Sequence, residues 1–511
     1  MENHTIPPKT LALFAENIMY KHSLKQLEFE DFNLPFDGHL RSDNRWVRLA
    51  KFIPWDKFEI AYSKSMTGSG LGPPAMSVRI ALGALIIKEK LGTSDEETVE
   101  QIRENPYLQY FIGFKEYRDE EPFHPTMFVH FRKRIGQKAI CEIIETINQK
   151  ARESNKKSKK KHKHDDDDGD GSTNEEQTNK GKLLIDATCT PADITFPTDL
   201  KILNEAREKS EKIIDILHGP HRGRLKKART YRKKARKEFL SVAKSKKVSQ
   251  GKLRKAIRKQ LGYLGRNLKT IDTLSQISSL LILEKRLYKL LLVINEVYRQ
   301  QKWMYDHGEK RIDDRIVSIY QPHVRPIKRG KPGSSTEFGA KISACLVDGY
   351  SFLDRLSWDA YNETLDLEGQ AEAYKARFGF YPESIHADKI YRTRNNIRFC
   401  KKHSIRLSGP ALGRPPADEE KRIAAQKQAR QDELDRIPIE GKFGQGKRRF
   451  SLSKIMCKLS VTSETAIAVV FLVMNLEKWL QSIFFYLFLL AHKAQCRQKR
   501  VNLGHLVAMN A

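Results

Sequence analysis

The chain has 511 residues and a formal net charge of +30 at pH 7, with 93 lysines and arginines against 63 aspartates and glutamates. This length exceeds that of a usual single domain, so two or three domains are expected, and so large a positive charge indicates a polyanionic partner, with nucleic acid as the first candidate. The six cysteines have no CxxC spacing, so neither a zinc site nor a disulfide framework is indicated, and the lack of a secretory signal predicts a cytoplasmic location.

The N-terminal part predicts a module of helices. Apolar residues recur at helical spacing over residues 77–91, and Ser94 with Glu97 forms a capping-box pattern that starts a second helix. A third helix is expected from Thr126, and its first turns are basic. Short turns before a basic helix are typical of a helix-turn-helix contact with DNA, and equally of a helical bundle with a solvated basic face.

A charged segment follows the helices. Residues 153–182 contain no apolar residue, and their blocks of like charge predict a disordered linker. The four aspartates at 165–168 have no fixed geometry on such a segment, so we expect no metal site there.

The pattern changes at Leu183. The run LLIDAT at 183–188 predicts a short buried strand that carries Asp186 to the edge of a sheet, or alternatively a strand-end turn aspartate without a further role. Residues 200–310 then predict long helices. Within 222–267, nineteen lysines or arginines accompany one acid, Glu238, so the surface there is a polycation.

Strands and helices alternate in the second half of the chain. Asp348-Gly349 between two apolar runs is a strong hairpin signal. A helix over 364–378, a strand ending at Asp388 and a helix over 393–403 follow. This element order predicts a mixed sheet covered by helices. The apolar stretch at 465–491 is interrupted by polar and charged residues, so it predicts a buried helix pair and no membrane span.

The stretch at 435–448 combines an acid with several cations. If a helix begins near Pro438, Glu440 lies in its first turn and Lys447 about two turns further on. One face would then present a carboxylate for a divalent metal and a cation for a DNA phosphate. Arg436 joins that face only if the helix starts earlier. Taken alone, the stretch is more typical of a solvated basic helix start.

Two strand-end aspartates and one helix-borne glutamate are what a two-metal phosphoryl-transfer site requires. The sequence resembles the DDE insertion-sequence transposases, whose catalytic domain has a ribonuclease-H-like fold. The resemblance rests on LLIDAT (183–188), QPHVRPIKRGK (321–331), EFGAKI (337–342), LSWDAYNE (356–363), HADKIYRTRNN (386–396) and the spacing Arg436-x3-Glu440-x6-Lys447. The stretch at 94–114 is similar to the helical domain that precedes the catalytic core in many of these elements.

The resemblance implies the site residues. Asp186, Asp388 and Glu440 match the metal-binding triad, which would hold two Mg²⁺ or Mn²⁺ ions. Arg436 and Lys447 match the basic partners of the glutamate. The family commonly has a tyrosine three residues before the arginine, and here that position is Glu433. Arg325, Arg329 and Lys331 are further candidates for DNA contact, or form a basic loop rim. Asp359 and Glu363 are candidates for groups that support the metal ligands, but helix capping or a position at a hairpin edge is the favoured interpretation.

The resemblance also implies the domain order. We expect a mixed α/β protein, with a ribonuclease-H-like sheet and a large helical insertion, preceded by an all-α domain. The expected boundaries are a helical N-terminal domain at 1–150, a disordered linker at 151–182, catalytic segments at 183–199 and 311–490, a basic insertion at 200–310, and a tail at 491–511.

The implied activity is DNA transposition. Such an enzyme binds the double-stranded ends of its element, cuts there, and joins the 3′ hydroxyl to target DNA. We expect a homodimer on DNA, associated with the nucleoid and with no membrane. The alternatives are a catalytically inactive or repurposed DNA-binding protein, and a structure-specific nuclease of the same fold.

Overall fold

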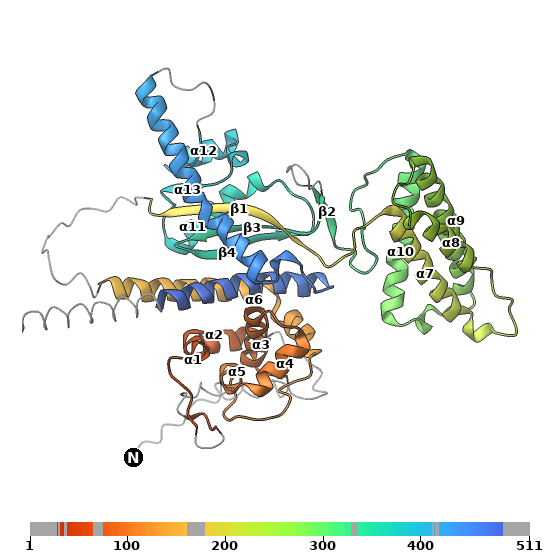
Figure 1. Cartoon of the computed structure of the whole chain (residues 1–511), viewed down its shortest axis with the longest axis horizontal. Coiled ribbons are helices and arrows are strands. Elements are labelled where there is room, and N and C mark those ends of the chain that lie inside the picture. The colour runs from red at the N-terminus through yellow and green to blue at the C-terminus, as the bar shows by residue number, and fades with distance from the viewer. Residues whose placement is uncertain are drawn as a thin grey trace, which may run out of the picture.

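Six strands form one mixed sheet in the part of the chain that the computed structural model describes (Figure 1). The described residues are 28, 31–34, 38–64, 75–160, 179–328, 336–410, 413 and 418–483. Helices from the N-terminal part lie below the sheet in Figure 1, and a separate bundle of helices stands to one side of it.

The central strand of the sheet is β1. The strands are β1 (Lys182–Pro191), β2 (Arg325–Lys328), β3 (Thr336–Val347), β4 (Tyr350–Ser357), β5 (Ser384–His386) and β6 (Arg406–Leu407). β1 pairs antiparallel with β3 on one side and parallel with β5 on the other, and β6 continues the sheet beyond β5. β2 and β4 both pair with β3. The predicted hairpin joins β3 to β4, because Asp348 and Gly349 adopt φ angles of 53° and 81°.

The helices of the sheet region are α11 (Asp366–Phe378), α12 (Arg394–Lys402) and α13 (Glu419–Arg449). The helix predicted over 393–403 is confirmed as α12, and the Thr393 side chain caps it. The helix predicted from Thr364 begins two residues later, after a 3-10 turn, η5 (Glu363–Leu365), whose cap is Asn362. The predicted strand end at Asp388 lies beyond β5, where Asp388 caps a second 3-10 turn, η6 (Lys389–Tyr391).

The prediction that a helix begins near Pro438 is wrong. α13 begins at Glu419, where the Asp418 side chain caps it, and continues through Pro438. Proline removes one backbone hydrogen bond from a helix interior. The helix persists because Ile439 and Phe443 are buried against the rest of the protein, so tertiary packing overrides the local preference.

The N-terminal helices are α1 (Arg45–Phe52), α2 (Trp55–Lys64), α3 (Val78–Leu91), α4 (Asp95–Glu104), α5 (Pro106–Ile112) and α6 (Met127–Lys160). The predicted cap is confirmed, because the Ser94 side chain accepts a hydrogen bond of 3.0 Å from the Glu97 amide. α6 kinks at Gly136 and extends to Lys160, into the segment predicted to be disordered. Residues 161–178, which include the aspartate run, lie outside the described residues.

The N-terminal helices and the sheet share one continuous hydrophobic core. Two long helices, α6 and Ser460–Ile483, lie side by side beneath the sheet and connect the two parts (Figure 1). The Thr465 hydroxyl donates a 2.9 Å hydrogen bond to the Arg132 carbonyl of α6, and the rings of Phe52 and Trp479 stack at 3.6 Å. The helix Ser460–Ile483 is long and apolar enough to cross a membrane by composition, but 67% of its most apolar window is buried in the protein.

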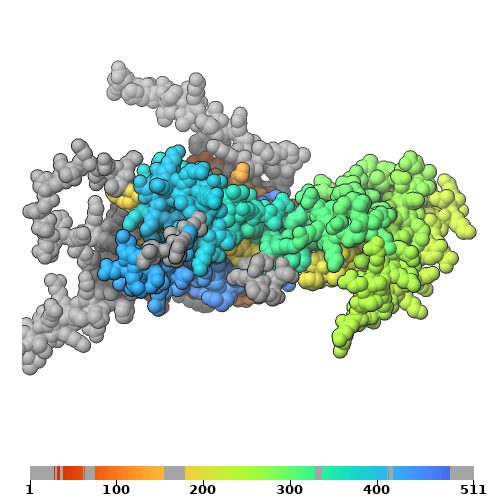
Figure 2. Space-filling view, turned by 90° about the horizontal axis from the view of Figure 1, so that it is seen from above, coloured from red at the N-terminus to blue at the C-terminus, as the bar shows by residue number. Residues whose placement is uncertain are grey.

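The bundle between β1 and β2 has a core of its own. Its helices are α7 (Asp199–His218), α8 (Arg232–Ala243), α9 (Gln250–Ser275) and α10 (Lys285–His307). Inside it, the fully buried Arg207 contacts Glu211 of the same helix and donates a 3.2 Å hydrogen bond to Gln260 of α9. Figure 2 shows the bundle projecting away from the rest of the molecule.

Candidate active site

A cavity of about 710 Å³ opens where β1, β3, the turns η5 and η6, and α13 meet. It contains all three predicted acids and both predicted basic partners, although these residues are far apart in the sequence. The polar residues that line it are Asp186, Thr188, Lys328, Lys341, Glu363, Asp388, Arg436, Glu440 and Lys447.

Asp186 lies in the middle of β1. Its Oδ1 atom accepts a 2.8 Å hydrogen bond from the Ala187 amide. Burial is the main reason that the pKa of Asp186 is raised to about 6. The Ala187 amide and the Arg436 guanidinium oppose this rise, and the carboxylates of Glu363 and Glu440 add to it. The ionised form of Asp186 is therefore destabilised by its desolvated, acidic surroundings.

Asp388 approaches Asp186 because β1 and β5 are parallel neighbours. Leu184 is paired with His386, so each aspartate lies two residues beyond a paired position. Both acids therefore lie just past the point where the parallel pairing ends. The predicted strand-end position of Asp186 is wrong, because β1 continues to Pro191 through its pairing with β3. Asp388 is exposed, and the Lys389 amide donates a hydrogen bond to its side chain.

Glu440 reaches the same place from α13. Because α13 begins well before Pro438, Arg436 lies one turn before Glu440 on the same face, and the two side chains form an ion pair of 2.7 Å. Two turns further on, the Lys447 ammonium donates a 2.9 Å hydrogen bond to the Thr188 hydroxyl of β1. Thr188 is two residues after Asp186, so this contact joins α13 to the face of β1 that carries the aspartate.

The other predicted DNA contacts lie elsewhere. Arg325 is on β2, where its guanidinium donates to the Pro322 carbonyl and lies 3.6 Å from Asp359, outside the cavity. Arg329 and Lys331 fall outside the described residues. Glu433, which replaces the family's tyrosine, is exposed beside a small neighbouring hollow that Asp388 also lines.

Three further charged residues line the cavity: Lys328 and Lys341, which were not predicted, and Glu363, for which helix capping or a hairpin edge was the favoured interpretation. The Lys341 ammonium on β3 forms a 2.8 Å ion pair with Glu363 at the start of η5. Of the roles considered for Glu363, helix capping is wrong, because Asn362 caps η5. The sequence did offer a signal for Glu363 as a site residue, because it is the last residue of the LSWDAYNE motif and lies just before the first helix after the hairpin.

A second group of possible metal ligands lies outside the residues that line this cavity. One ligand atom each from His386, Asp432 and Asp435 fall within 4.8 Å of one another. Burial opposes the ionised form of Asp432, but Arg406 at 2.8 Å and the Gly409 amide hold its pKa below the usual range. A 2.6 Å contact with Lys182 likewise lowers the pKa of Asp435. These acids are already neutralised, so the group anchors α13 to the sheet.

The donor set of the first cavity fits a divalent cation better. Among the described residues, Asp186 and Asp388 accept hydrogen bonds from backbone amides and form no ion pair. Glu363 and Glu440 each have one cation as a partner. Burial, and to a smaller extent the carboxylates of Glu363 and Glu440, raise the pKa of Asp186, so its charge lacks a compensating partner in the part of the chain that the structure describes. Hard oxygen ligands are those that Mg²⁺ and Mn²⁺ prefer.

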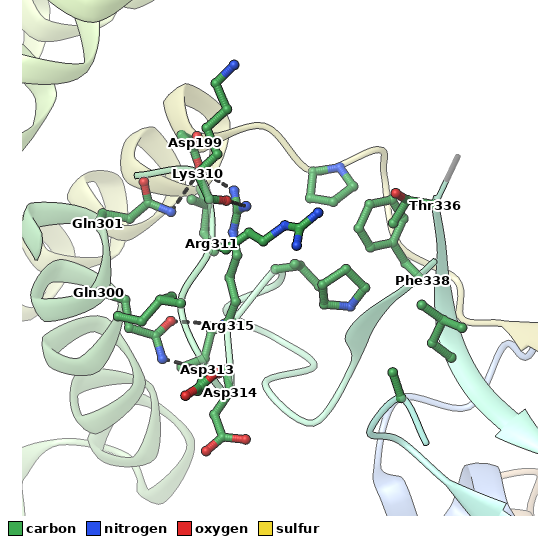
Figure 3. Close-up of a pocket in the computed structure, with 18 of the residues that line it drawn as sticks. Asp199, Gln300, Gln301, Lys310, Arg311, Asp313, Asp314, Arg315, Thr336 and Phe338 are labelled. Carbon is green, nitrogen blue, oxygen red and sulfur yellow. Dashed lines mark hydrogen bonds and ion pairs between the residues drawn. The ribbon is translucent and has the colours of Figure 1, made fainter. Parts of the chain in front are cut away.

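A larger cavity of about 1010 Å³ adjoins the first, between the bundle and the edge of the sheet (Figure 3). Lys328 and Lys341 line both cavities. In the larger one, Asp199 pairs with Arg315 at 2.5 Å and accepts a 3.0 Å hydrogen bond from Gln301. These contacts attach the segment after α10 to the bundle. We therefore interpret the charged residues of the larger cavity as structural links between the bundle and the sheet.

Comparisons with known proteins agree with the resemblance. A family model described as a transposase DDE domain matches residues 385–477, and one described as a transposase domain (DUF772) matches residues 34–134. The first match contains Asp388, Glu440 and Lys447. The uncharacterized protein ORF8 in the nfe locus of Rhizobium meliloti is 30% identical over 160 residues, which are 31% of this chain and 68% of that protein. No solved structure matches the chain.

Proposed function

The chain belongs to the DDE transposases, and on that premise we propose that it cuts DNA at the ends of a mobile element and joins the 3′ hydroxyl to target DNA. Its mixed sheet, with an antiparallel half around β3 and a parallel half around β5, is the ribonuclease-H-like fold of the family. One observation carries the proposal. Asp186, Asp388 and Glu440 line a single cavity together with Arg436 and Lys447.

We assign the three acids as the ligands of two Mg²⁺ or Mn²⁺ ions. When bound, such ions activate a water or a 3′ hydroxyl and stabilise the leaving oxygen. The acids lie on three elements that are fixed by the sheet register and by the burial of α13, so their positions are set before DNA arrives. Asp186 is the most constrained of them, since it lies inside a strand that is paired on both sides.

The basic partners are assigned to the DNA phosphate. Lys447 is held by Thr188 on the same side of β1 as Asp186, so its charge lies beside the acids. Arg436 pairs with Glu440 and is adjacent to the same cavity. Charge-assisted contacts of this kind position a scissile phosphate, and one misplaced contact slows the reaction strongly.

The wider DNA surface is assigned to the bundle. The basic stretch at 222–267 covers α8, most of α9 and the loop before α8, and most of its lysines and arginines are exposed. A projecting basic unit can contact double-stranded DNA away from the cut site. Because an element has two ends, we propose a homodimer on DNA, in the cytoplasm at the nucleoid.

The test uses the full chain and the DNA that flanks its own reading frame. Imperfect inverted repeats bounded by a short direct duplication are expected there. With Mg²⁺, labelled duplexes of these repeats should be nicked at the boundary and joined to a plasmid, and Glu440→Gln should do neither. Cleavage without joining would favour the structure-specific nuclease. Binding without cleavage would favour the repurposed DNA-binding protein.

A further inference from the structure

We propose that Glu363 is a fourth carboxylate of the metal site, and that Lys341 neutralises it until a divalent cation displaces the lysine. The inference rests on the proposed function, because it adds a residue to the same site. It is carried by the position of Glu363, by the contacts that fix that position, and by an unpartnered hydroxyl beside it.

Glu363 lies on the wall of the cavity that contains Asp186. Its side chain is 23% exposed and that of Lys341 is 16% exposed, so their ion pair of 2.8 Å is largely shielded from water. The Lys341 ammonium also donates a 2.9 Å hydrogen bond to the Tyr361 carbonyl. Lys341 has this second acceptor, so it keeps a partner when a metal ion takes Glu363.

One buried amide connects Glu363 to the predicted ligand Asp388. The Asn396 side chain donates hydrogen bonds of 2.9 Å to the Thr364 carbonyl and 2.8 Å to the Tyr391 carbonyl. Thr364 follows Glu363 in η5, and Tyr391 ends the turn η6 that Asp388 caps. Asn396 is only 7% exposed, so its bonds hold the two acidic turns in a fixed relation.

The Tyr391 hydroxyl gives independent support. Tyr391 is fully buried, and among the described residues its hydroxyl has no hydrogen-bond partner. Burial raises the pKa of Tyr391, and the nearby carboxylates of Glu363 and Asp186 raise it further. A buried donor is rarely left unpaired. A metal ion shared with Asp186 would require the Glu363 carboxylate to move toward Asp186. The Tyr391 hydroxyl could then donate a hydrogen bond to it.

The charge count agrees with this arrangement. Asp186, Asp388, Glu440 and Glu363 carry four negative charges, which balance two divalent cations. The displaced Lys341 would then add its positive charge to a cavity that Lys447 of α13 also lines. Cations that line a site stabilise a phosphate bound in it.

The experiment measures metal binding without DNA. Mn²⁺ is titrated into the full chain by calorimetry, and free Mn²⁺ is followed by electron paramagnetic resonance. Glu363→Gln should weaken binding at least tenfold. Asp359→Asn is the matched control, since it removes the same charge from the same loop at a side chain that is 71% exposed and outside the cavity. It should change the affinity less than twofold.

A second variant tests the role of the lysine. Lys341→Met removes the competing cation, so Mn²⁺ should bind several times more tightly. Unchanged binding in Glu363→Gln, or weaker binding in Lys341→Met, would overturn the inference. Glu440→Gln separates this from the proposed function. If it weakens Mn²⁺ binding and Glu363→Gln does not, only the fourth carboxylate is wrong. If the wild-type protein binds no Mn²⁺, both proposals fail.

Discussion

Replacing Asp186 with asparagine is expected to stabilise the metal-free protein while it abolishes cleavage. The pKa of this carboxyl is raised from its ordinary value of 3.8 to about 6, first by burial and then by Glu363 and Glu440. An acid whose pKa is raised by folding favours the folded state only while it is protonated. At neutral pH the charge therefore opposes folding, and asparagine removes it without changing the shape.

The size of the gain follows from the pKa values. A shift from 3.8 to about 6 corresponds to about 3 kcal/mol. The side chain is not fully buried, so solvent screening lowers the expected gain to about 1–3 kcal/mol. The wild-type cost is absent below pH 3.8, grows as the pH rises to about 6, and is constant above that. At pH 5 the gain should be about half of its value at pH 7.5.

Urea unfolding in EDTA, followed by circular dichroism, measures this gain for the wild type, Asp186→Asn and the control Asp359→Asn at both pH values. The control is expected to stay within about 0.5 kcal/mol of the wild type, as exposed substitutions do. Added Mg²⁺ should stabilise the wild type more than Asp186→Asn. If Asp186→Asn is no more stable than the wild type at pH 7.5, or gains equally at both pH values, the acidic surroundings of Asp186 have been misjudged.

Three further predictions concern DNA. Asp388→Asn and Glu440→Gln should each abolish strand cleavage in a gel assay while DNA binding is kept, and near-normal cleavage would remove that residue from the triad. Lys447→Ala should slow cleavage by about 10-fold to 100-fold, because a lost charge-assisted contact costs about 1.5–3 kcal/mol. Arg448 is exposed, so Arg448→Ala should have little effect. Equal effects of the two substitutions would indicate that α13 is an ordinary basic helix at this point. If the stretch 222–267 neutralises about six DNA phosphates, the logarithm of the DNA-binding constant should fall with the logarithm of the salt concentration at a slope of about −5. A variant whose lysines and arginines in this stretch are replaced by neutral residues should give a shallower slope. An unchanged slope would show that the stretch does not contact DNA.

Signals that act within a few residues predicted the local structure well. The Ser94 cap and the Asp348-Gly349 turn were predicted because the backbone geometry at each site depends on its own side chains. The prediction at Pro438 failed because tertiary packing outweighed a local preference. The burial of Ile439 and Phe443 stabilises the helix through Pro438, and neighbouring residues alone do not reveal that burial.

The candidate site shows the same division. Asp186, Asp388 and Glu440 were predicted from the family resemblance, which links distant positions. Helix capping or a hairpin edge was favoured for Glu363 because its partner Lys341 lies on β3, and sequence spacing does not show that η5 packs against that strand. The shared core of the N-terminal helices and the sheet was hidden for the same reason, since it depends on contacts made after the chain has folded.

The order in which the sheet is synthesised has a consequence for incomplete chains. β1 emerges from the ribosome first, but its neighbours β3 and β5 follow only after the bundle has been made. At roughly 5–20 residues per second, the wait between Asp186 and Asp388 is on the order of 10–40 s. The bundle has its own core and can fold during that time. Both edges of β1 remain open to unwanted strand pairing until β3 is made, and the edge that pairs with β5 remains open until β5 is made. A product that stops before α13 would keep the basic bundle and lack Glu440, so truncated chains are expected to compete for DNA without cutting it.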